Sequence, residues 1–280
     1  MKEFKGKVAA ITGAGSGIGR ALAMALAKSE CNLALSDVDQ TGLEETVELL
    51  KHTSVNVTSN IVDVANRQGM HDWADTVFKD HGKVNYIFNN AGVALGGTVD
   101  DTDYQDFEWI IGINMWGVIH GTKAFLPLIK KSAGTGHVIN ISSVFGLFSQ
   151  PTQSGYNLSK FAVRGFTESL RQELDLANNG VSATCVHPGG IKTNIARNAR
   201  MTESVTSLSG NTTPENLKER FESLFMTTPE QAADTILKAV KANRRRVLVG
   251  PDAKFLDFMQ RSLPAQYQRI VTSAFQFAAR

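Results

Sequence analysis

The sequence predicts an α/β protein: a single Rossmann-type domain with a doubly wound parallel sheet of about seven strands and helices on both faces. Three observations lead to this prediction. Short apolar runs alternate along the chain with longer segments of helical periodicity, which is the order of βαβ units. The strand-like runs are apolar throughout rather than alternating, as expected for strands buried on both faces. The first run ends in a glycine-rich turn that leads straight into a helix.

Length and composition agree with one globular domain that has a sizeable core. The chain has 280 residues, of which 42% are hydrophobic and 20% charged, with a net charge of +2. No apolar run has the length of a membrane span, and the amino terminus passes directly into a strand, so no signal peptide is expected. Cys31 and Cys185 lie inside apolar runs, which favours two reduced core residues over a disulfide. Reduced cysteines in turn favour a cytoplasmic location.

The first half of the chain contains four strand-like runs separated by helical segments. Strands are expected at residues 7–12, 31–36, 55–62 and 84–88, and helices at 18–28 and 40–51. A long helix is expected from about residue 103 to residue 131, with Gly112, Gly117 and Gly121 inside it. Because a glycine inside a helix costs up to about 1 kcal/mol relative to alanine, these positions predict close packing against a sheet or another helix.

The second half continues this alternation and then loses it. Strands are expected at 138–141 and 181–186, with a helix between them that carries Tyr156. Residues 193–213 are rich in Ser, Thr, Asn and Arg, which predicts a mobile flap at about 190–226. Order resumes at Thr228 with a capping box, followed by a strand at 246–249. A terminal helix follows, with the apolar members Phe255, Phe258, Met259, Ile270 and Phe275.

The first strand ends in a turn that is suited to a phosphate group. Residues 12–19 read Thr-Gly-Ala-Gly-Ser-Gly-Ile-Gly, a G-x-x-x-G-x-G spacing that differs from the G-x-G-x-x-G fingerprint. Glycines let a backbone approach a pyrophosphate, and the free N–H groups that begin the next helix attract it. The expected binding residues are Gly13, Ser16, Gly17, Ile18 and Gly19. The alternative is a glycine-rich turn that binds no ligand.

Two acidic residues lie at the ends of the next two strands. Asp37 follows the glycine turn by roughly twenty residues, the position from which an acid binds a ribose 2′-hydroxyl. Asp63 ends the third strand, where its carboxylate and the backbone of Val64 are placed to bind an adenine amino group. An equally good alternative for Asp63 is the N-cap of the following helix.

Tyr156 and Lys160 are four residues apart in a segment that continues as a helix. Residues at this spacing share one helical face, so the phenol and the ammonium group can converge on one point. Lowering a phenol pKa from near 10 to about 7 takes roughly 4 kcal/mol, most of which one ammonium group at close range can supply. The alternative is an ordinary amphipathic helix with a surface lysine.

These residues belong to a longer series of motifs that occur in a fixed order. The series is Thr12-Gly13-x-x-x-Gly17-x-Gly19, Asn89-Asn90-Ala91-Gly92, Asn114, Ser143, Tyr156-x-x-x-Lys160 and Pro188-Gly189. In order and spacing it resembles the short-chain dehydrogenase/reductase superfamily over residues 5 to about 195. Each motif is weak alone, but together they are specific. The resemblance implies an oxidoreductase acting on alcohol or carbonyl groups, with residues 1–250 as the catalytic domain, the flap on its substrate side, and 251–280 as a helical extension of the same domain.

The resemblance also implies a role for each matching residue. Tyr156 would be the acid/base that exchanges a proton with the substrate hydroxyl, and Lys160 would lower its pKa and hold the nicotinamide ribose. Ser143 would hydrogen-bond the substrate oxygen, and Asn114 would anchor a water that relays the proton. The remaining cofactor contacts would come from Asn90, Ala91, Gly92, Pro188, Gly189, Ile191 and Thr193.

NAD(H) is the expected cofactor, in preference to NADP(H). A 2′-phosphate would face the carboxylate of Asp37, and like charges at short range repel. Family members that use the phosphorylated cofactor usually carry a basic residue at the positions occupied here by Ser16 and Val38, both uncharged. Arg20 is the residue that could still bind the phosphate. No metal is expected, because the chemistry needs none and no His/Cys cluster occurs.

The expected substrate is an apolar alcohol, ketone or aldehyde. The segments 93–95 and 144–148 and the flap after Gly190 are the expected pocket walls, and they are mostly apolar; Lys192, Arg197 and Arg200 are the candidate charged partners. An NADPH-dependent carbonyl reductase is one alternative. A non-catalytic dinucleotide sensor is another, against which the intact set of Ser143, Tyr156 and Lys160 argues.

Further partners are expected to be copies of the chain itself rather than nucleic acid. The long helix from residue 103 and the helix that carries Tyr156 resemble the pair through which family members form homodimers and homotetramers. From Asn243 onward the chain is basic, with seven Lys and Arg residues against two Asp residues. Such a tail can contact a membrane surface through the C-terminal helix, although a solvated face is the commoner outcome.

Overall fold

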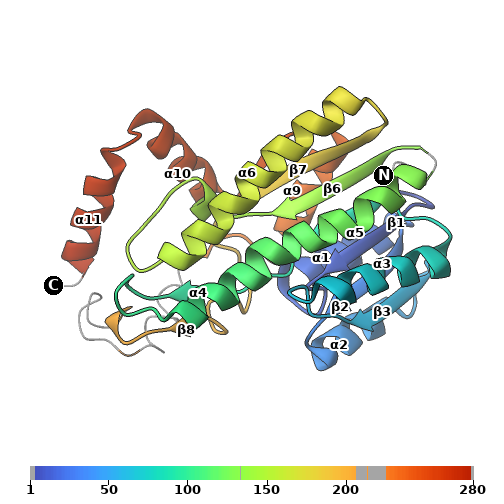
Figure 1. Cartoon of the computed structure of the whole chain (residues 1–280), viewed down its shortest axis with the longest axis horizontal. Helices are drawn as coiled ribbons and strands as arrows, with labels where there is room; N and C mark the ends of the chain where they lie inside the picture. Colours follow the sequence, from blue (N-terminus) through green and yellow to red (C-terminus); the bar gives the residue numbers. More distant parts are fainter. Residues whose placement is uncertain (1–3, 133, 206–212, 214–224, 279–280) are drawn as a thin grey trace.

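The structure, a computed structural model, describes residues 4–132, 134–205, 213 and 225–278. Its centre is a seven-stranded sheet in the order β3-β2-β1-β4-β6-β7-β9, with every pair of neighbours parallel (Figure 1). The strands are β1 (Val8–Thr12), β2 (Asn32–Asp37), β3 (Val57–Ile61), β4 (Tyr86–Asn89), β6 (Gly136–Ile141), β7 (Val181–Pro188) and β9 (Arg246–Val249). The predicted single-domain, doubly wound parallel sheet is confirmed.

Helices cover both faces of this sheet. One apolar core joins the sheet to α1 (Gly17–Ala27), α2 (Gln40–Leu50) and α9 (Pro229–Lys241). A second core, on the other face, joins it to α3 (Arg67–His81), α5 (Gly117–Lys131) and α6 (Ser154–Ala177). Figure 1 shows α5 and α6 in front of the strands. The five inner strands, β2, β1, β4, β6 and β7, are mostly buried on both sides, as expected for strands covered by helices on both faces.

The strand order fixes where a ligand can bind. The chain moves outward from β1 to β3, then returns to place β4 on the other side of β1. The order therefore reverses between β1 and β4, and the loops that leave the carboxyl ends of these strands diverge. Such a reversal point opens a crevice, and it is bordered here by the residues that follow Thr12 and Asn89.

The boundaries of the seven strands and of α1 and α2 differ from the sequence predictions by at most two residues. The expected burial on both faces does fail for β3, whose residues are half-buried or exposed. This strand is at the edge of the sheet and pairs only with β2. Its polar sequence, Val-Thr-Ser-Asn-Ile, fits an edge position.

The long helix predicted for residues 103–131 is divided into three parts. An α-helix, α4 (Tyr104–Ile111), passes into a π-helical segment, η1 (Gly112–Trp116), and then into α5. The predicted close packing of its glycines is confirmed at Gly117, where a Cβ would lie 2.7 Å from the side chain of Val64, and at Gly121, where a Cβ would collide with Asn89.

The C-terminal segment forms two helices instead of the one predicted: α10 (Pro251–Ser262) and α11 (Tyr267–Ala278). α10 ends before Leu263, whose φ of −130° is not helical, and the following proline, Pro264, disfavours a helical conformation at this residue. Figure 1 shows both helices at one side of the layered body. Tyr267 and Val271 of α11 pack against Phe148, in the loop between β6 and α6. Within the described part of the chain, no helix has the length and apolarity to cross a membrane.

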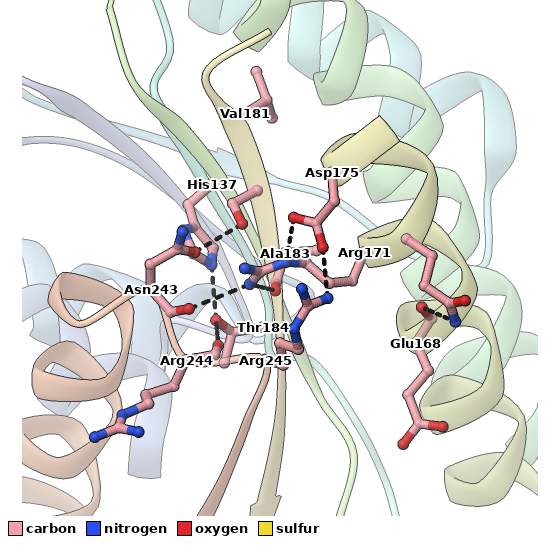
Figure 2. Close-up of polar contacts among 12 residues, drawn as sticks. His137, Glu168, Arg171, Asp175, Val181, Ala183, Thr184, Asn243, Arg244 and Arg245 are labelled. Atoms are coloured by element: carbon pink, nitrogen blue, oxygen red, sulfur yellow. Dashed lines mark hydrogen bonds and ion pairs between the residues drawn. The ribbon is translucent and has the colours of Figure 1, made fainter. Parts of the chain in front are cut away.

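A buried polar network joins α6 to the sheet at the end opposite the crevice (Figure 2). The guanidinium of Arg171 donates to Asp175 at 2.9 Å and to the backbone oxygen of Ala183 at 3.0 Å. Next to it, His137 Nε2 lies 2.7 Å from the hydroxyl of Thr184. Burial, assisted by the charge of Arg171, lowers the pKa of His137 to about 3. His137 is therefore a neutral structural residue at physiological pH.

The low pKa of His137 predicts that the fold loses stability in mild acid. An unfolded histidine, with a pKa near 6.5, binds a proton that folded His137 rejects, so stability falls as the pH drops from about 6.5 toward about 3. Between about pH 7.5 and about pH 5, this residue should remove about 2 kcal/mol of unfolding free energy. Urea titrations at the two pH values test this against His137→Gln, which should show a distinctly smaller loss. Equal losses in the two proteins would contradict the assignment.

Candidate active site

Tyr156 and Lys160 project from the first turns of α6 toward the carboxyl end of β6. The ammonium nitrogen of Lys160 lies 5.6 Å from the centre of the Tyr156 ring and donates a hydrogen bond to the backbone oxygen of Ile141 at 3.2 Å. Ser143 follows β6 and caps the short helix η2 (Val144–Gly146) through its hydroxyl. The Ser143 side chain also forms a hydrogen bond with that of Tyr156. Three of the four predicted catalytic residues, Ser143, Tyr156 and Lys160, therefore lie together at the carboxyl end of β6.

Burial is the dominant influence on the two titratable groups of this site. It raises the pKa of Tyr156 to about 12, against which the hydrogen bond with Ser143 acts in the opposite direction. It lowers the pKa of Lys160 to about 8. The expected lowering of the Tyr156 pKa by Lys160 is therefore wrong for this arrangement: the pKa is raised, and Ser143 rather than Lys160 opposes the rise. Removal from water disfavours the charged form of each group.

Asn114 is completely buried in the π-helical segment behind these residues. Its side-chain oxygen accepts a hydrogen bond from the backbone N–H of Val93 at 2.8 Å, and its amide donates to the Val93 carbonyl and to the Ser159 hydroxyl. Asn114 therefore ties the loop after β4 to α6. A Cβ on Gly92 would lie 3.1 Å from the Asn114 oxygen and 3.3 Å from the Lys160 nitrogen, so Gly92 allows this close approach.

The glycine-rich turn after β1 has the conformation that its sequence predicts. Gly13 and Gly17 have φ values of 66° and 52°, in the left-handed region that favours glycine. A Cβ on Gly13 would lie 2.8 Å from the backbone of Ala91. Ser16 occupies the N-cap of α1, but its side chain makes no capping hydrogen bond. The first N–H groups of α1 consequently face the crevice without a side-chain acceptor from the cap.

Hydrogen bonds of Thr12 and Asn90 fix the position of the turn. The Thr12 hydroxyl accepts hydrogen bonds from the backbone N–H groups of Asn90 and Ala91, both at 3.0 Å. The Asn90 side chain donates in return to the carbonyls of Thr12 and Gly13, at 3.0 and 3.1 Å. The loops that follow β1 and β4 are therefore joined directly across the reversal point.

Asp37 lies beside the glycine turn, at the end of β2. Its carboxylate accepts hydrogen bonds from the backbone N–H of Gly15 at 2.8 Å and of Asp39 at 3.0 Å. Arg20 also contacts this turn, because its guanidinium donates to the Gly15 carbonyl. It donates as well to three groups of α2: the Thr46 hydroxyl at 2.9 Å, the Gly42 carbonyl at 3.0 Å and Glu45 at 2.8 Å.

Asp63 does not cap the next helix. The N-cap of α3 is Asn66, whose side chain accepts a hydrogen bond from Gly69 N at 3.0 Å. The carboxylate of Asp63 accepts one from the backbone N–H of Ala65 at 2.9 Å. The alternative that made Asp63 an N-cap is therefore wrong, and both Asp63 and Val64 border the crevice.

A single cavity of about 590 Å³ brings these parts together. It is lined by every residue predicted for the site except Gly19, which packs against Gly13, and Asn114, which lies behind Gly92. One end of the cavity holds the glycine turn and Asp37, and the other holds Ser143, Tyr156 and Lys160. Among the residues that the structure describes, no group of three His, Cys, Asp or Glu side chains could hold a metal ion.

The wall beyond Tyr156 is apolar with a few amides. Its apolar members are Val93, Ala94, Val144, Phe145, Ile195, Ala196, Phe225 and Leu256, and its amides are Gln150, Gln153, Asn194 and Asn198. Three candidates from the sequence, Lys192, Arg197 and Arg200, do not line it. Arg200 instead pairs with Asp106 at 2.8 Å and stacks on the ring of Trp109 at 3.8 Å.

Part of the predicted flap is anchored to the body of the protein. Strand β8 (Arg200–Met201) pairs in parallel with β5 (Leu95–Gly96), and the backbone N–H of Ser204 donates to Asp101 at 2.9 Å. These contacts bring the preceding residues into the cavity wall. Residues 206–212 and 214–224 of the predicted flap lie outside the described residues.

Asp252 is a site residue that the sequence analysis missed. It lies in the first turn of α10, borders the cavity, and accepts a hydrogen bond from the backbone N–H of Gly190 at 2.6 Å. A Cβ on Gly189 or Gly250 would collide with its carboxylate, so three glycines close around it. The available signal was an acid in the first turn of a helix, but that pattern alone does not indicate a distant partner.

Comparisons with protein families and with known proteins both match this chain to dehydrogenases and oxidoreductases. A family described as short chain dehydrogenase matches residues 7–204. SadH of Mycobacterium tuberculosis strain H37Rv, named as an oxidoreductase, is 49% identical over 274 residues that cover 98% of this chain and 96% of that protein. The C alpha-dehydrogenase of Sphingobium sp. strain SYK-6 is 30% identical over 276 residues, which cover 98% of this chain and 88% of that protein.

A solved structure agrees with these sequence comparisons. The crystal structure of a short chain dehydrogenase/reductase from Burkholderia phymatum in complex with NAD matches this chain with a TM-score of 0.87 and 32% identity. The match covers 96% of this chain and 97% of the other. The likeness therefore extends past residue 204 and includes the C-terminal segment.

Proposed function

Because this chain belongs to the short-chain dehydrogenase family of oxidoreductases, we propose that it transfers a hydride between NAD(H) and the alcohol or carbonyl carbon of an apolar small molecule. One observation carries the proposal: the cavity joins the glycine turn and Asp37 at one end to Ser143, Tyr156 and Lys160 at the other. The second end has both a proton donor, Tyr156, and a cation, Lys160, among its lining residues. A dinucleotide bound along this cavity would place its nicotinamide ring at that end.

The residues at the first end fit a nicotinamide dinucleotide. Gly13 and Gly17 are required by the packing of the turn, since a Cβ on Gly17 would lie 2.9 Å from Thr193. The N–H groups of α1 would bind the phosphates, and Asp37 the adenosine ribose. Asp63 and Val64 would contact the adenine, and Pro188, Gly189, Ile191 and Thr193 the carboxamide.

The residues at the second end would handle the proton. When bound, the nicotinamide ring supplies the hydride acceptor and, in its oxidised form, a positive charge. In alcohol oxidation, Tyr156 would accept the hydroxyl proton while the hydride leaves the carbinol carbon, which leaves a carbonyl; in reduction, Tyr156 would donate the proton. Ser143 would hold the substrate oxygen beside the phenol, and Lys160 would stabilise the phenolate. Asn114 would position Gly92 and α6.

An apolar substrate is the second part of the proposal. The wall beyond Tyr156 offers aliphatic and aromatic side chains and amides. Lys192, Arg197 and Arg200, the candidate partners for a charged substrate, do not line the cavity. A screen of alcohols and carbonyls, followed by the absorbance of the reduced cofactor, tests this. Faster turnover of polyols than of aliphatic or aromatic compounds of similar size would contradict the substrate class. Cofactor binding without any turnover would favour a non-catalytic dinucleotide sensor.

Asp252 should matter for cofactor affinity through the turn that it holds. Asp252→Ala leaves the Gly190 N–H without its partner, and loss of such a charge-assisted bond is worth about 1.5–3 kcal/mol. We expect the KM for the cofactor to rise about 10-fold or more with a smaller change in kcat. Asp252→Asn, which keeps an acceptor, should recover part of the affinity. Asp234→Ala, an exposed acid on α9, is the control and should change neither constant.

A homodimer or homotetramer is proposed to form through the faces of α5 and α6. Trp116 precedes α5 with 48% of its surface exposed, and Leu158 and Phe161 on α6 are 53% and 38% exposed. We expect Leu158→Asp with Phe161→Asp to reduce the mass measured by light scattering at micromolar concentration. Leu176→Asp, at the far end of the same helix, should leave the mass unchanged. A monomeric unmodified protein would refute the proposal.

A further inference from the structure

The outward side of helix α10 exposes two large aromatic residues. Phe255 and Phe258 lie three residues apart on its outward side, 63% and 69% exposed. Lys254 and Arg261 belong to the same exposed side. We call these four residues the aromatic face of α10. The inward side of the helix, by contrast, is occupied by Ala253, Leu256 and Asp257, which are buried or half-buried.

In α10 and α11 the acidic residues lie on the inward side, whereas the basic residues are exposed. Asp252 accepts a hydrogen bond from Gly190, and Asp257 is buried between Arg246 at 3.2 Å and Arg261 at 3.8 Å. Of the described residues of these helices, the exposed charged ones are Lys254, Arg261 and Arg269. The basic surface continues past α10, because Lys238, Arg244, Arg246 and Lys254 line one groove beside β9. The aromatic face is thus framed by cations.

We propose that the aromatic face of α10 binds the surface of an anionic phospholipid bilayer. Exposed aromatic side chains flanked by Lys and Arg are the composition of helices that lie in the headgroup region, where the rings enter the acyl boundary and the cations contact acidic lipids. The charge pattern favours this occupant over a second copy of the face, since self-docking would bring Lys254 and Arg261 toward the same cations. The contact that we propose is peripheral, with the helix lying on the bilayer surface.

The position of α10 relates this contact to the cavity. Leu256, on the inward side of the same helix, lines the wall beyond Tyr156. Docking through the outward side would therefore hold this wall close to the bilayer, in which apolar compounds concentrate. That consequence rests on the proposed function, whereas the bilayer contact itself does not, because its test measures binding without turnover.

The test is co-sedimentation of the full chain with vesicles of phosphatidylcholine alone and of phosphatidylcholine mixed equally with phosphatidylglycerol. We expect the bound fraction to be at least about 5-fold higher on the anionic vesicles and to fall when salt is raised from about 0.05 M to about 0.5 M. Phe255→Ser with Phe258→Ser, and separately Lys254→Glu, should each lower binding to the anionic vesicles about 5-fold or more.

Tyr104→Ser is the matched control, because Tyr104 is an exposed aromatic residue on α4, outside the aromatic face. It should bind vesicles like the unmodified protein, and thermal unfolding should confirm that all variants fold. Equal binding to neutral and anionic vesicles, or undiminished binding by the double Phe variant, would overturn the proposal. So would a drop in oligomer mass in that variant together with no vesicle binding by the unmodified protein, since the aromatic face would then be a subunit contact.

Discussion

Replacing Tyr156 by phenylalanine is expected to lower kcat at least about 100-fold while the fold and cofactor binding persist. The ring would remain, together with its edge-on contact with Phe145 at 5.9 Å between centroids, so the cavity wall should keep its shape. The change removes only the hydroxyl that hydrogen-bonds to Ser143 and is proposed to exchange the substrate proton. No other phenol lines the cavity within the described residues.

Stopped-flow or steady-state absorbance of the reduced cofactor measures the loss, and cofactor fluorescence measures binding separately. Tyr104→Phe, at an exposed position on α4, is the matched control and should keep full turnover. Lys160→Ala should also lower kcat, since it removes the cation closest to the phenol. Near-normal turnover by the Tyr156 variant would show that the proton moves by another route.

The site could be predicted from the sequence where a short motif determines its own geometry. The turn at residues 13–17 needs left-handed backbone at Gly13 and Gly17, and only glycine adopts it freely. The four-residue spacing of Tyr156 and Lys160 sets their common face as soon as the helix forms. Parallel pairing then brings the carboxyl ends of β1, β4 and β6 to one edge, so the motifs converge without further information.

The contacts that the sequence did not reveal join segments that are far apart and carry no motif. Asp252 and Gly190 are 62 positions apart, and neither residue type indicates the other. The parallel pairing of Leu95 with Arg200 is equally remote, and two-residue strands leave no periodicity to detect. Residues 112–116 read as ordinary helix, because a shift from α to π hydrogen bonding changes the backbone pairing and not the pattern of apolar residues.

The surroundings of Tyr156 show a further limit of the sequence analysis. From spacing alone, Lys160 was expected to dominate the pKa of the phenol. The structure encloses both groups, and desolvation raises the pKa of Tyr156 and lowers that of Lys160. Burial depends on everything that packs around a group, including Phe145 and Val93, so a two-residue motif does not determine it.

The second large effect is expected for the choice of cofactor. The unmodified protein should favour NAD(H) over NADP(H) in kcat/KM by at least about 100-fold, because a 2′-phosphate would meet the carboxylate of Asp37. Unit charges of one sign at about 4 Å repel by about 4 kcal/mol at the effective dielectric of a protein surface. We expect Arg20 not to offset this repulsion, because its guanidinium already donates to the Gly15 carbonyl and to Thr46, Gly42 and Glu45.

Asp37→Ala combined with Val38→Arg should reverse or largely abolish this preference. The first change removes the repulsion, and the second adds a cation at a residue that is 64% exposed and borders the cavity. Efficiency with NAD(H) should also fall, because Gly15 loses the acceptor that lies 2.8 Å from its N–H. Glu45→Gln, which weakens one contact of Arg20, should leave the preference unchanged if Arg20 takes no part. A higher kcat/KM with NADP(H) in the unmodified protein would show that Asp37 is not the selector, and Arg20 would then be the residue to examine at the phosphate.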